Sequence, residues 1–207
     1  MPAAESPPAK VVVLASGGGT LLQALLDDRA SSPASSGWTI TAVGSDRRSC
    51  PALDRAADAG VPTFSVPLAD HADRDGWNAA LADRCADADL IVLAGFMKLL
   101  GPPFLTRHDG KVINSHPSLL PAFPGMHAPR DALEYGVAVT GCSIFLVDAG
   151  VDAGPIVAQQ AVPVLPDDTV DALHERIKVA ERVLLVEVVT AMTTRGWRVS
   201  GRKVTLG

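Results

Sequence analysis

The chain has 207 residues, of which 47% are hydrophobic and 20% are charged, and its formal net charge is −5. This composition is typical of a folded globular protein and excludes a disordered or fibrous chain. The net negative charge gives no positive electrostatic field that would attract nucleic acid. The longest apolar run, residues 90–97, is far too short to span a bilayer.

Strand and helix patterns alternate along the chain. Apolar runs indicate buried strands, and apolar residues at helical spacing between turn residues indicate helices. In chain order we predict strand 11–15, a helix from residue 20, loop 29–37, strand 38–43, helix 51–59, strand 61–66, helix 73–86, and strands 89–94 and 111–114. Beyond these we predict helix 128–135, strands 138–147 and 155–163, and helix 168–195.

This alternation predicts an α/β fold, with a Rossmann-like, mostly parallel sheet flanked by helices. The short link between the last two predicted strands favours an antiparallel addition on the C-terminal side. We expect residues 1–9 to form a flexible tail and residues 10–207 a single domain. Ligands bind beyond the carboxyl ends of such strands, where the unusual segments 16–20, 95–100 and 114–121 should meet.

Three widely spaced cysteines, Cys50, Cys85 and Cys142, form no CxxC pair. This pattern argues against a disulfide framework or a zinc site and favours a reducing compartment. We therefore expect small core residues in a cytoplasmic protein without a signal peptide.

Three consecutive glycines follow the first predicted strand, in Ser16-Gly17-Gly18-Gly19-Thr20. A glycine turn at a helix N-terminus leaves backbone N–H groups free to bind phosphate. The pattern is not G-x-G-x-x-G, because Leu22 stands at the last glycine position, and no GK[ST] follows. Nicotinamide and ATP are therefore disfavoured, and the alternative is a tight turn without a ligand.

Asn114 and His116 lie two positions apart where a predicted strand ends, so both should project toward one region. Asp152, in the turn 148–155, would favour the protonated form of this imidazole. An amide and an imidazolium together can stabilise an oxyanion during acyl transfer. The alternatives are a structural histidine and an aspartate that serves only its own turn.

Other candidates are less specific. Residues 95–100 form an apolar loop that could be a slot for a flat ring system or a turn that only packs. His127 is a candidate for lining the site. We expect His71, His108 and His174 to be surface or helix residues without a role.

Together these segments resemble the phosphoribosylglycinamide formyltransferases, which are folate-dependent enzymes of purine biosynthesis. The resemblance extends from about residue 11 to residue 195. The Asn-x-His-Pro-Ser-Leu-Leu-Pro block with a later Asp is typical of transferases that use formyltetrahydrofolate, and Phe-Pro-Gly-x-His favours the glycinamide ribonucleotide branch over the tRNA branch. The resemblance is carried by residues 15–20, 93–98, 114–121, 123–127 and 147–155.

The length leads to the expectation that the chain lacks the additional C-terminal domain of methionyl-tRNA formyltransferases and the additional N-terminal domain of formyltetrahydrofolate hydrolases. The resemblance implies formyl transfer from 10-formyltetrahydrofolate, as co-substrate, to the amine of 5'-phosphoribosylglycinamide in IMP synthesis. No ligand cluster has the spacing of a metal site. We expect a monomer or homodimer that binds small-molecule substrates, and neither nucleic acid nor a membrane.

The resemblance also implies residue roles. Asn114, His116 and Asp152 would be catalytic, and Gly19, Thr20, Leu21 and Glu181 would bind the ribonucleotide. The folate would contact Arg74, Met97, Lys98, Leu99, Leu100, Asp148, Ala149, Gly150 and Val151.

Four positions depart from the family pattern. Gly18 and Leu21 stand where many relatives have Asn, Lys98 where many have Arg, and Phe145 where a histidine is common. The phosphate loop would then rely more on backbone donors. Lys98 retains the positive charge of an arginine but lacks the planar guanidinium group that can donate two parallel hydrogen bonds. Two other hypotheses stay open, a hydrolase that releases formate from the same folate and a nucleotide-binding module without turnover.

Overall fold

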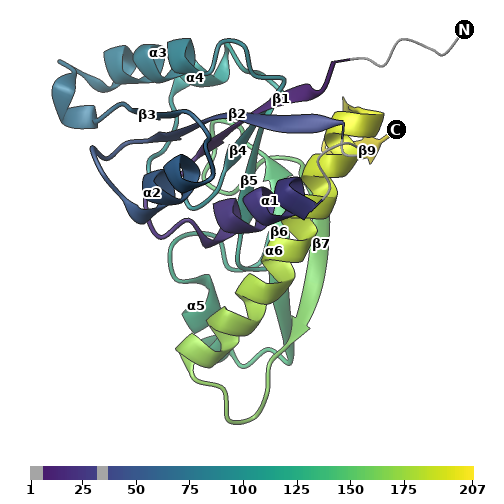
Figure 1. Cartoon of the computed structure of the whole chain (residues 1–207). Helices are drawn as coiled ribbons and strands as arrows, with labels where there is room; N and C mark the ends of the chain where they lie inside the picture. Colours follow the sequence, from purple (N-terminus) through teal and green to yellow (C-terminus); the bar gives the residue numbers. More distant parts are fainter. Residues whose placement is uncertain (1–6, 32–36) are drawn as a thin grey trace, which may run out of the picture.

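The computed structural model describes residues 7–31 and 37–207. Its framework is a seven-stranded sheet of order β3-β2-β1-β4-β5-β6-β7 (Figure 1). The strands are β1 (Ala9–Leu14), β2 (Trp38–Ser45), β3 (Thr63–Ser65), β4 (Leu90–Leu93), β5 (Val112–His116), β6 (Val139–Leu146) and β7 (Ile156–Pro163). The helices are α1 (Thr20–Ser31), α2 (Pro51–Asp58), α3 (Arg74–Arg84), α4 (Pro102–Leu105), α5 (Ala128–Tyr135) and α6 (Val170–Arg195), with a 3-10 turn, η1, at Leu68–Asp70.

The predicted α/β fold with a mostly parallel sheet is confirmed. Strands β1 to β5 are parallel, and β6 and β7 add to them in antiparallel orientation. β1 begins at Ala9, so the predicted tail 1–9 is too long: the Ala9 N–H donates to Gly37 O at 2.8 Å. Of the remaining tail, residues 1–6 lie outside the described residues.

Two further differences concern segments with weak local patterns. α1 continues to Ser31, into the predicted loop 29–37, and the Ser31 hydroxyl donates to Asp27 O one turn back at 2.8 Å. Residues 32–36 of that loop lie outside the described residues. A C-terminal hairpin was not predicted, because its two strands are short and largely exposed. It consists of β8 (Trp197–Ser200) and β9 (Lys203–Leu206).

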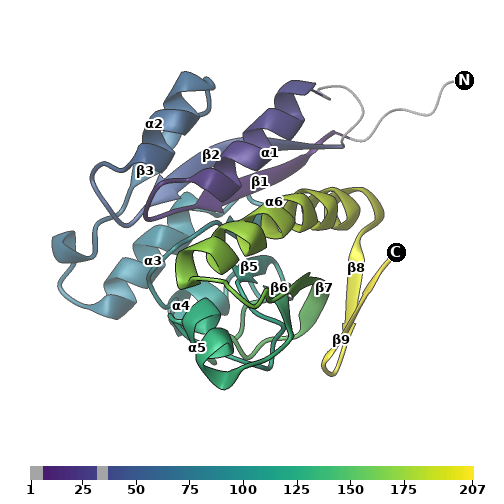
Figure 2. The same cartoon turned by 90° about the horizontal axis from the view of Figure 1, so that it is seen from below.

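Helices cover both faces of the sheet because its parallel strands are apolar on both sides. In β1, Val11 and Val13 pack in the core under α1, α2 and α6, whereas Val12 and Leu14 pack in the core under α3 and α4. Figure 2 shows α1 and α6 side by side on the first of these faces. The alternation of side chains thus divides one strand between two cores.

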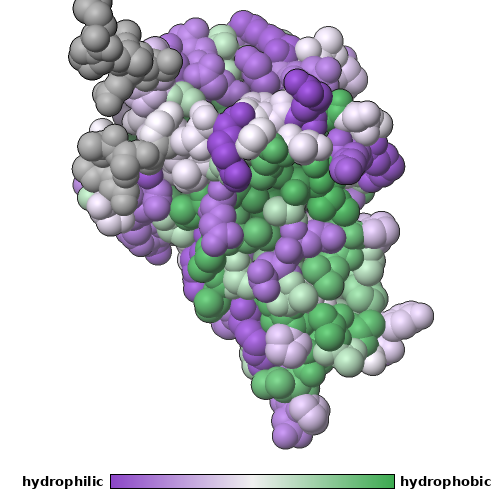
Figure 3. Space-filling view, turned by 90° about the vertical axis from the view of Figure 1, so that its right-hand side faces the viewer, coloured by the Kyte–Doolittle hydropathy of each residue, from purple (hydrophilic) through white to green (hydrophobic). Residues whose placement is uncertain are grey.

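β7 forms one edge of the sheet. Hydrophobic residues gather on the side of the molecule where β7 lies, interrupted by polar residues (Figure 3). Val157 and Ala158 of β7 and Val204 and Leu206 of β9 are partly buried against the core. The C-terminal hairpin therefore covers part of this edge, which limits the unpaired strand surface that the sheet exposes.

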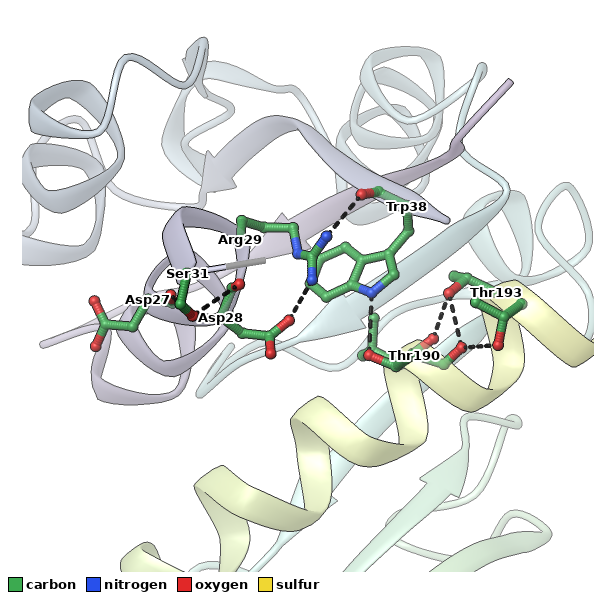
Figure 4. A network of polar contacts seen from close by, with 9 residues as sticks. Asp27, Asp28, Arg29, Ser31, Trp38, Thr190 and Thr193 are labelled. Atoms are coloured by element: carbon green, nitrogen blue, oxygen red, sulfur yellow. Dashed lines mark hydrogen bonds and ion pairs between the residues drawn. The ribbon is translucent and has the colours of Figure 1, made fainter. Parts of the chain in front are cut away.

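The amino end of β2 is joined to two helices through Trp38. Its indole N–H donates to Thr190 Oγ1 on α6 at 3.1 Å. The guanidinium of Arg29 on α1 lies 4.1 Å from the ring centroid and donates to Trp38 O at 3.3 Å (Figure 4). Trp38 is only 2% exposed, so it ties α1, β2 and α6 together at the end of the sheet opposite the carboxyl ends of the parallel strands.

We predict that Trp38→Ala lowers the free energy of unfolding by about 3–5 kcal/mol, because it leaves a cavity under two helices. Trp38→Phe should cost less, since it retains most of the packing and loses mainly the indole hydrogen bond. Urea denaturation of both variants measures the two values. A Trp38→Ala protein as stable as the parent would contradict this account.

Candidate functional site

The candidate catalytic residues lie at the carboxyl end of β5. The strand extends to His116, beyond the predicted end at residue 114, so Asn114 and His116 project from the same face of one rigid strand. Asn114 pairs with Leu93 of β4 and with Phe145 of β6, and His116 pairs with Ser143. Strand geometry therefore fixes the spacing between the amide and the imidazole.

Both ring nitrogens of His116 face oxygen atoms. Nε2 lies 2.8 Å from Phe123 O, which can only accept a hydrogen bond, and Nδ1 lies 3.5 Å from Asp152 Oδ2. The imidazole is buried, with the side chain 6% exposed, and the carboxylate is 12% exposed. The structure thus brings together Asn114, His116 and Asp152, which lie up to 38 positions apart in the sequence.

The backbone around Asp152 is shaped by several contacts. Asp152 has φ of +49°, and its Oδ2 accepts the backbone N–H of Gly125 at 2.8 Å. Arg202, at the tip of the C-terminal hairpin, donates to Ala153 O at 2.9 Å and to Gly154 O at 3.3 Å. A Cβ at Gly154 would lie 1.7 Å from a backbone oxygen of β6, so only glycine fits there. These contacts hold the carboxylate beside the imidazole.

The loop after β5 is held by a residue that sequence reasoning missed. The buried Ser143 hydroxyl donates to Ser118 O at 2.7 Å and accepts the Leu120 N–H at 3.0 Å. Gln159 of β7 adds hydrogen bonds to Leu120 O and to the same hydroxyl. A serine within an apolar strand was the available signal, because a buried hydroxyl needs partners.

The glycine loop links β1 to α1. Gly19 has φ of +72°, and a Cβ there would lie 2.8 Å from Ala52, so this turn requires glycine. Arg55 of α2 donates to Gly18 O at 2.8 Å, and Ala52 N donates to Gly17 O at 3.1 Å. These bonds occupy carbonyl groups and leave the N-terminal N–H groups of α1 available for an anion.

The predicted residues of this loop differ in what they can offer. Thr20 is exposed at the start of α1. The side chain of Leu21 packs in the core with α6, so Leu21 can present only its backbone N–H. Gly18 is exposed, which agrees with a loop that would use backbone donors.

The loop after β4 presents apolar side chains to solvent. Met97 is 65% exposed and Leu99 is 63% exposed, whereas Leu100 packs against the core of α3 and α4. Arg74 donates to Leu99 O at 2.6 Å, which places it against this loop. Lys98 lies between the exposed residues, with its Nζ 3.9 Å from the carboxylate of Asp46. The turn after β6 is also exposed at Asp148, Ala149, Gly150 and Val151.

The three expected segments do meet. The Ser16 N–H donates to Gly95 O at 3.1 Å, and Leu93 pairs with Asn114. The ends of β1, β4 and β5 therefore form one continuous edge that carries the glycine loop, the apolar loop and the catalytic candidates.

Comparisons with known proteins agree with this architecture. A family model described as formyl transferase matches residues 9–189. The chain belongs to this family. It is 55% identical over 205 residues to a phosphoribosylglycinamide formyltransferase of Mycobacterium tuberculosis, covering 98% of this chain and 93% of that protein. It is also 44% identical over 179 residues to the trifunctional purine biosynthetic protein adenosine-3 of Homo sapiens, covering 86% of this chain and 18% of that protein.

The fold of a solved relative is nearly the same. The crystal structure of glycinamide ribonucleotide transformylase 1 from Symbiobacterium toebii matches with a TM-score of 0.93 and 41% identity, covering 97% of this chain and 95% of that one. The chain is therefore a formyltransferase of the phosphoribosylglycinamide branch, as the sequence motifs indicated.

Glu181 lies on the other face of β5. It comes from α6, is 5% exposed, and accepts a hydrogen bond from the Ser115 hydroxyl. Burial raises the pKa of this carboxyl above its ordinary value, and the Ser115 hydrogen bond and the charge of His116 act in the opposite direction. Ser115 is thus a second residue that sequence reasoning missed, although its position between Asn114 and His116 was a signal.

The other histidines and the cysteines are placed differently from the catalytic candidates. His127 is exposed at the residue before α5. The prediction of a surface or helix position was wrong for His108, which is 3% exposed after α4: its Nε2 contacts Ala82 O, and burial lowers its pKa. Burial raises the pKa of the Cys85 and Cys142 thiols to about 12, so both are protonated core residues.

In residues 7–31 and 37–207, no group of three or more His, Cys, Asp or Glu side chains is arranged to hold a metal ion. No helix in the same residues has both the length and the apolar character to cross a membrane.

We predict that Glu181→Gln changes how stability depends on pH. Because the folded pKa of Glu181 lies above 4.5, the unfolded chain ionises first, and the wild type loses stability relative to the variant as pH rises from about 4.5 through the folded pKa. Melting temperatures of both proteins at about pH 4 and pH 8 measure this shift. Glu187→Gln, on an exposed position of α6, is the matched control. If the stability difference between Glu181→Gln and the wild type did not change with pH, the raised pKa of Glu181 would be contradicted.

Proposed function

We propose that this enzyme transfers the formyl group of 10-formyltetrahydrofolate to the amine of 5'-phosphoribosylglycinamide, giving formylglycinamide ribonucleotide and tetrahydrofolate in IMP synthesis. The observation that carries the proposal is the pairing of His116 with Asp152 beside Asn114. The names of the relatives supply the two substrates. The same proposal includes a cytoplasmic location, a single domain, and a monomeric or homodimeric state.

The two nitrogens of His116 have different roles in this proposal. Nε2–H is used by the Phe123 carbonyl. Nδ1 faces Asp152 across 3.5 Å, which is longer than a normal N–H···O hydrogen bond. A formyl oxygen bound beside Asp152 would therefore accept the Nδ1–H, while the Asp152 charge stabilises the imidazolium.

The reaction needs no protein nucleophile, because the neutral substrate amine attacks the formyl carbon itself. The C=O electron pair moves to the formyl oxygen, where Asn114 and His116 donate hydrogen bonds to the developing charge. When the electron pair returns, the bond between carbon and N10 breaks. The folate nitrogen takes up a proton from His116, directly or through water, and the proton that the amine gives up restores the imidazolium, so that no net proton is gained or lost.

The substrate-binding roles follow the placement of the loops. The N–H groups of Gly19, Thr20 and Leu21 would bind the phosphate at the start of α1. Glu181, across β5 from the trio, would contact the glycinamide end. The folate would lie along the exposed apolar loop and the turn after β6, at Arg74, Met97, Lys98, Leu99, Leu100, Asp148, Ala149, Gly150 and Val151.

Phe145 supports a dry environment at the reacting carbon. It is 2% exposed and stands directly opposite Asn114 on the neighbouring strand, so it lies on the same face. An apolar ring beside the amide lowers the local dielectric, which strengthens the hydrogen bond from Asn114 to an oxyanion.

We predict that His116→Ala and Asp152→Asn each lower kcat by about 10²–10⁴, because each removes part of the oxyanion stabilisation and proton transfer. Affinity for the ribonucleotide phosphate should change little, since the glycine loop is a separate segment. Steady-state kinetics of both variants measure kcat and KM. His71→Ala, at the end of the 3-10 turn η1, is the histidine control. Near-normal turnover in either variant would contradict the mechanism.

A spectrophotometric assay with a formyl-donating folate, with and without glycinamide ribonucleotide, tests the function itself. We expect deformylated folate to form only when the ribonucleotide is present. Product without the ribonucleotide would indicate a formyl-folate hydrolase, and binding of both ligands without product would indicate a binding module.

A further inference from the structure

A buried polar cluster connects the ends of three strands outside the catalytic trio. Ser16 follows β1, Asp46 follows β2, and Met97 lies in the loop after β4. Ser16 is 1% exposed and Asp46 is 8% exposed. Polar side chains this deeply buried are normally held by specific hydrogen bonds, so their hydrogen-bond partners indicate their structural role.

The Ser16 hydroxyl joins two of these segments. It donates to Asp46 Oδ1 at 2.5 Å and accepts the backbone N–H of Met97 at 2.8 Å. An ionised carboxylate only accepts hydrogen bonds, so Asp46 directs the hydroxyl proton of Ser16 toward itself. A lone pair of the hydroxyl is then left facing Met97.

The second oxygen of the same carboxylate faces the next residue of the loop. Asp46 Oδ2 lies 3.9 Å from Lys98 Nζ. One buried carboxylate therefore acts on two consecutive residues, on Met97 through Ser16 and on Lys98 directly. Because a buried charge is costly without partners, Asp46 favours the arrangement in which both contacts are made.

The cluster also stands next to the phosphate loop. Ser16 immediately precedes Gly17, whose carbonyl is bound by the Ala52 N–H, and the Ser16 N–H is bound to Gly95 O. A displacement of the glycine loop would thus be transmitted to the loop after β4 through one serine. Packed elements of this kind carry energetic coupling when two sites bias the same arrangement.

We propose that Ser16 and Asp46 form a lock between the two substrate loops, so that ribonucleotide bound to the glycine loop strengthens folate binding to the loop after β4. By linkage, bound folate strengthens ribonucleotide binding by the same factor. Both are positioning residues, because they act through the loops that they join. This inference rests on the proposed function, which assigns one substrate to each loop.

The test is an equilibrium titration of 5,8-dideazafolate, which carries no formyl group, with and without saturating glycinamide ribonucleotide. We expect the wild type to bind the folate analogue at least about fivefold more tightly when the ribonucleotide is present. Ser16→Ala and Asp46→Ala should reduce this factor to below about twofold. Calorimetry measures the affinities, and thermal melting confirms that each variant is folded.

Two variants sharpen the comparison. Asp46→Asn should give a coupling factor between those of the wild type and Asp46→Ala, because the amide oxygen still accepts the Ser16 hydroxyl proton while the ion pair with Lys98 is lost. Ser65→Ala is the matched control: it also removes a serine hydrogen bond at a strand end, to Arg47 O at 2.8 Å, but it joins neither substrate loop. It should leave the coupling factor unchanged.

The outcomes separate the lock from the function. Full coupling in folded Ser16→Ala or Asp46→Ala would overturn the lock, as would a wild type that transfers formyl groups without any coupling. If Ser16→Ala does not fold, the comparison of Asp46→Ala with Asp46→Asn decides. A wild type that binds neither ligand would overturn the proposed function instead.

Discussion

The side-by-side pairing of β1, β4 and β5 is the constraint on which the site depends. Backbone hydrogen bonds between these strands place three chain segments at one edge of the sheet, and the Ser16 N–H bond to Gly95 O continues this pairing into the loops. Each strand contributes a different element there. The glycine turn, the apolar loop and the amide–imidazole pair are held in register by main-chain bonds, so the site requires few side chains to assemble it.

Buried polar groups at this edge are kept in place because hydrogen-bond donors face acceptors. His116 lies between a carbonyl and a carboxylate, Ser143 makes hydrogen bonds to two loop backbones, and Ser16 makes hydrogen bonds to a carboxylate and an N–H. Such networks are effective only when every member is satisfied. They allow loops, which are otherwise the mobile part of an α/β protein, to present groups with the precision of strands.

The two faces of β5 carry different electrostatics. On one face, the imidazole of His116 and the carboxyl group of Asp152 stand near Asn114 and the apolar ring of Phe145. On the other face, Glu181 is buried against Ser115 with a raised pKa. Alternating side chains of one strand thus separate the imidazole of His116 from a buried carboxyl whose pKa is raised by burial.

The sequence by itself determined the features that depend on local pattern. Alternating apolar segments indicate the parallel sheet, and the spacing of Asn114 and His116 places both on one side of a strand. Gly19 marks a turn that no other residue could make. The short hairpin carrying Arg202 and the extent of α1 were not predictable in this way, because their apolar periodicity is weak.

Only the tertiary structure decided which distant residues meet. The 3.5 Å contact of His116 with Asp152, the hydrogen bond of Ser16 to Asp46, and the bonds from Arg202 to Ala153 and Gly154 join positions 30 to 49 residues apart. Their formation depends on strand order, loop closure and the packing of two cores, which no local periodicity encodes. The chemistry of an imidazole and a carboxylate suggested the first of these pairings, and the fold was needed to reveal the others.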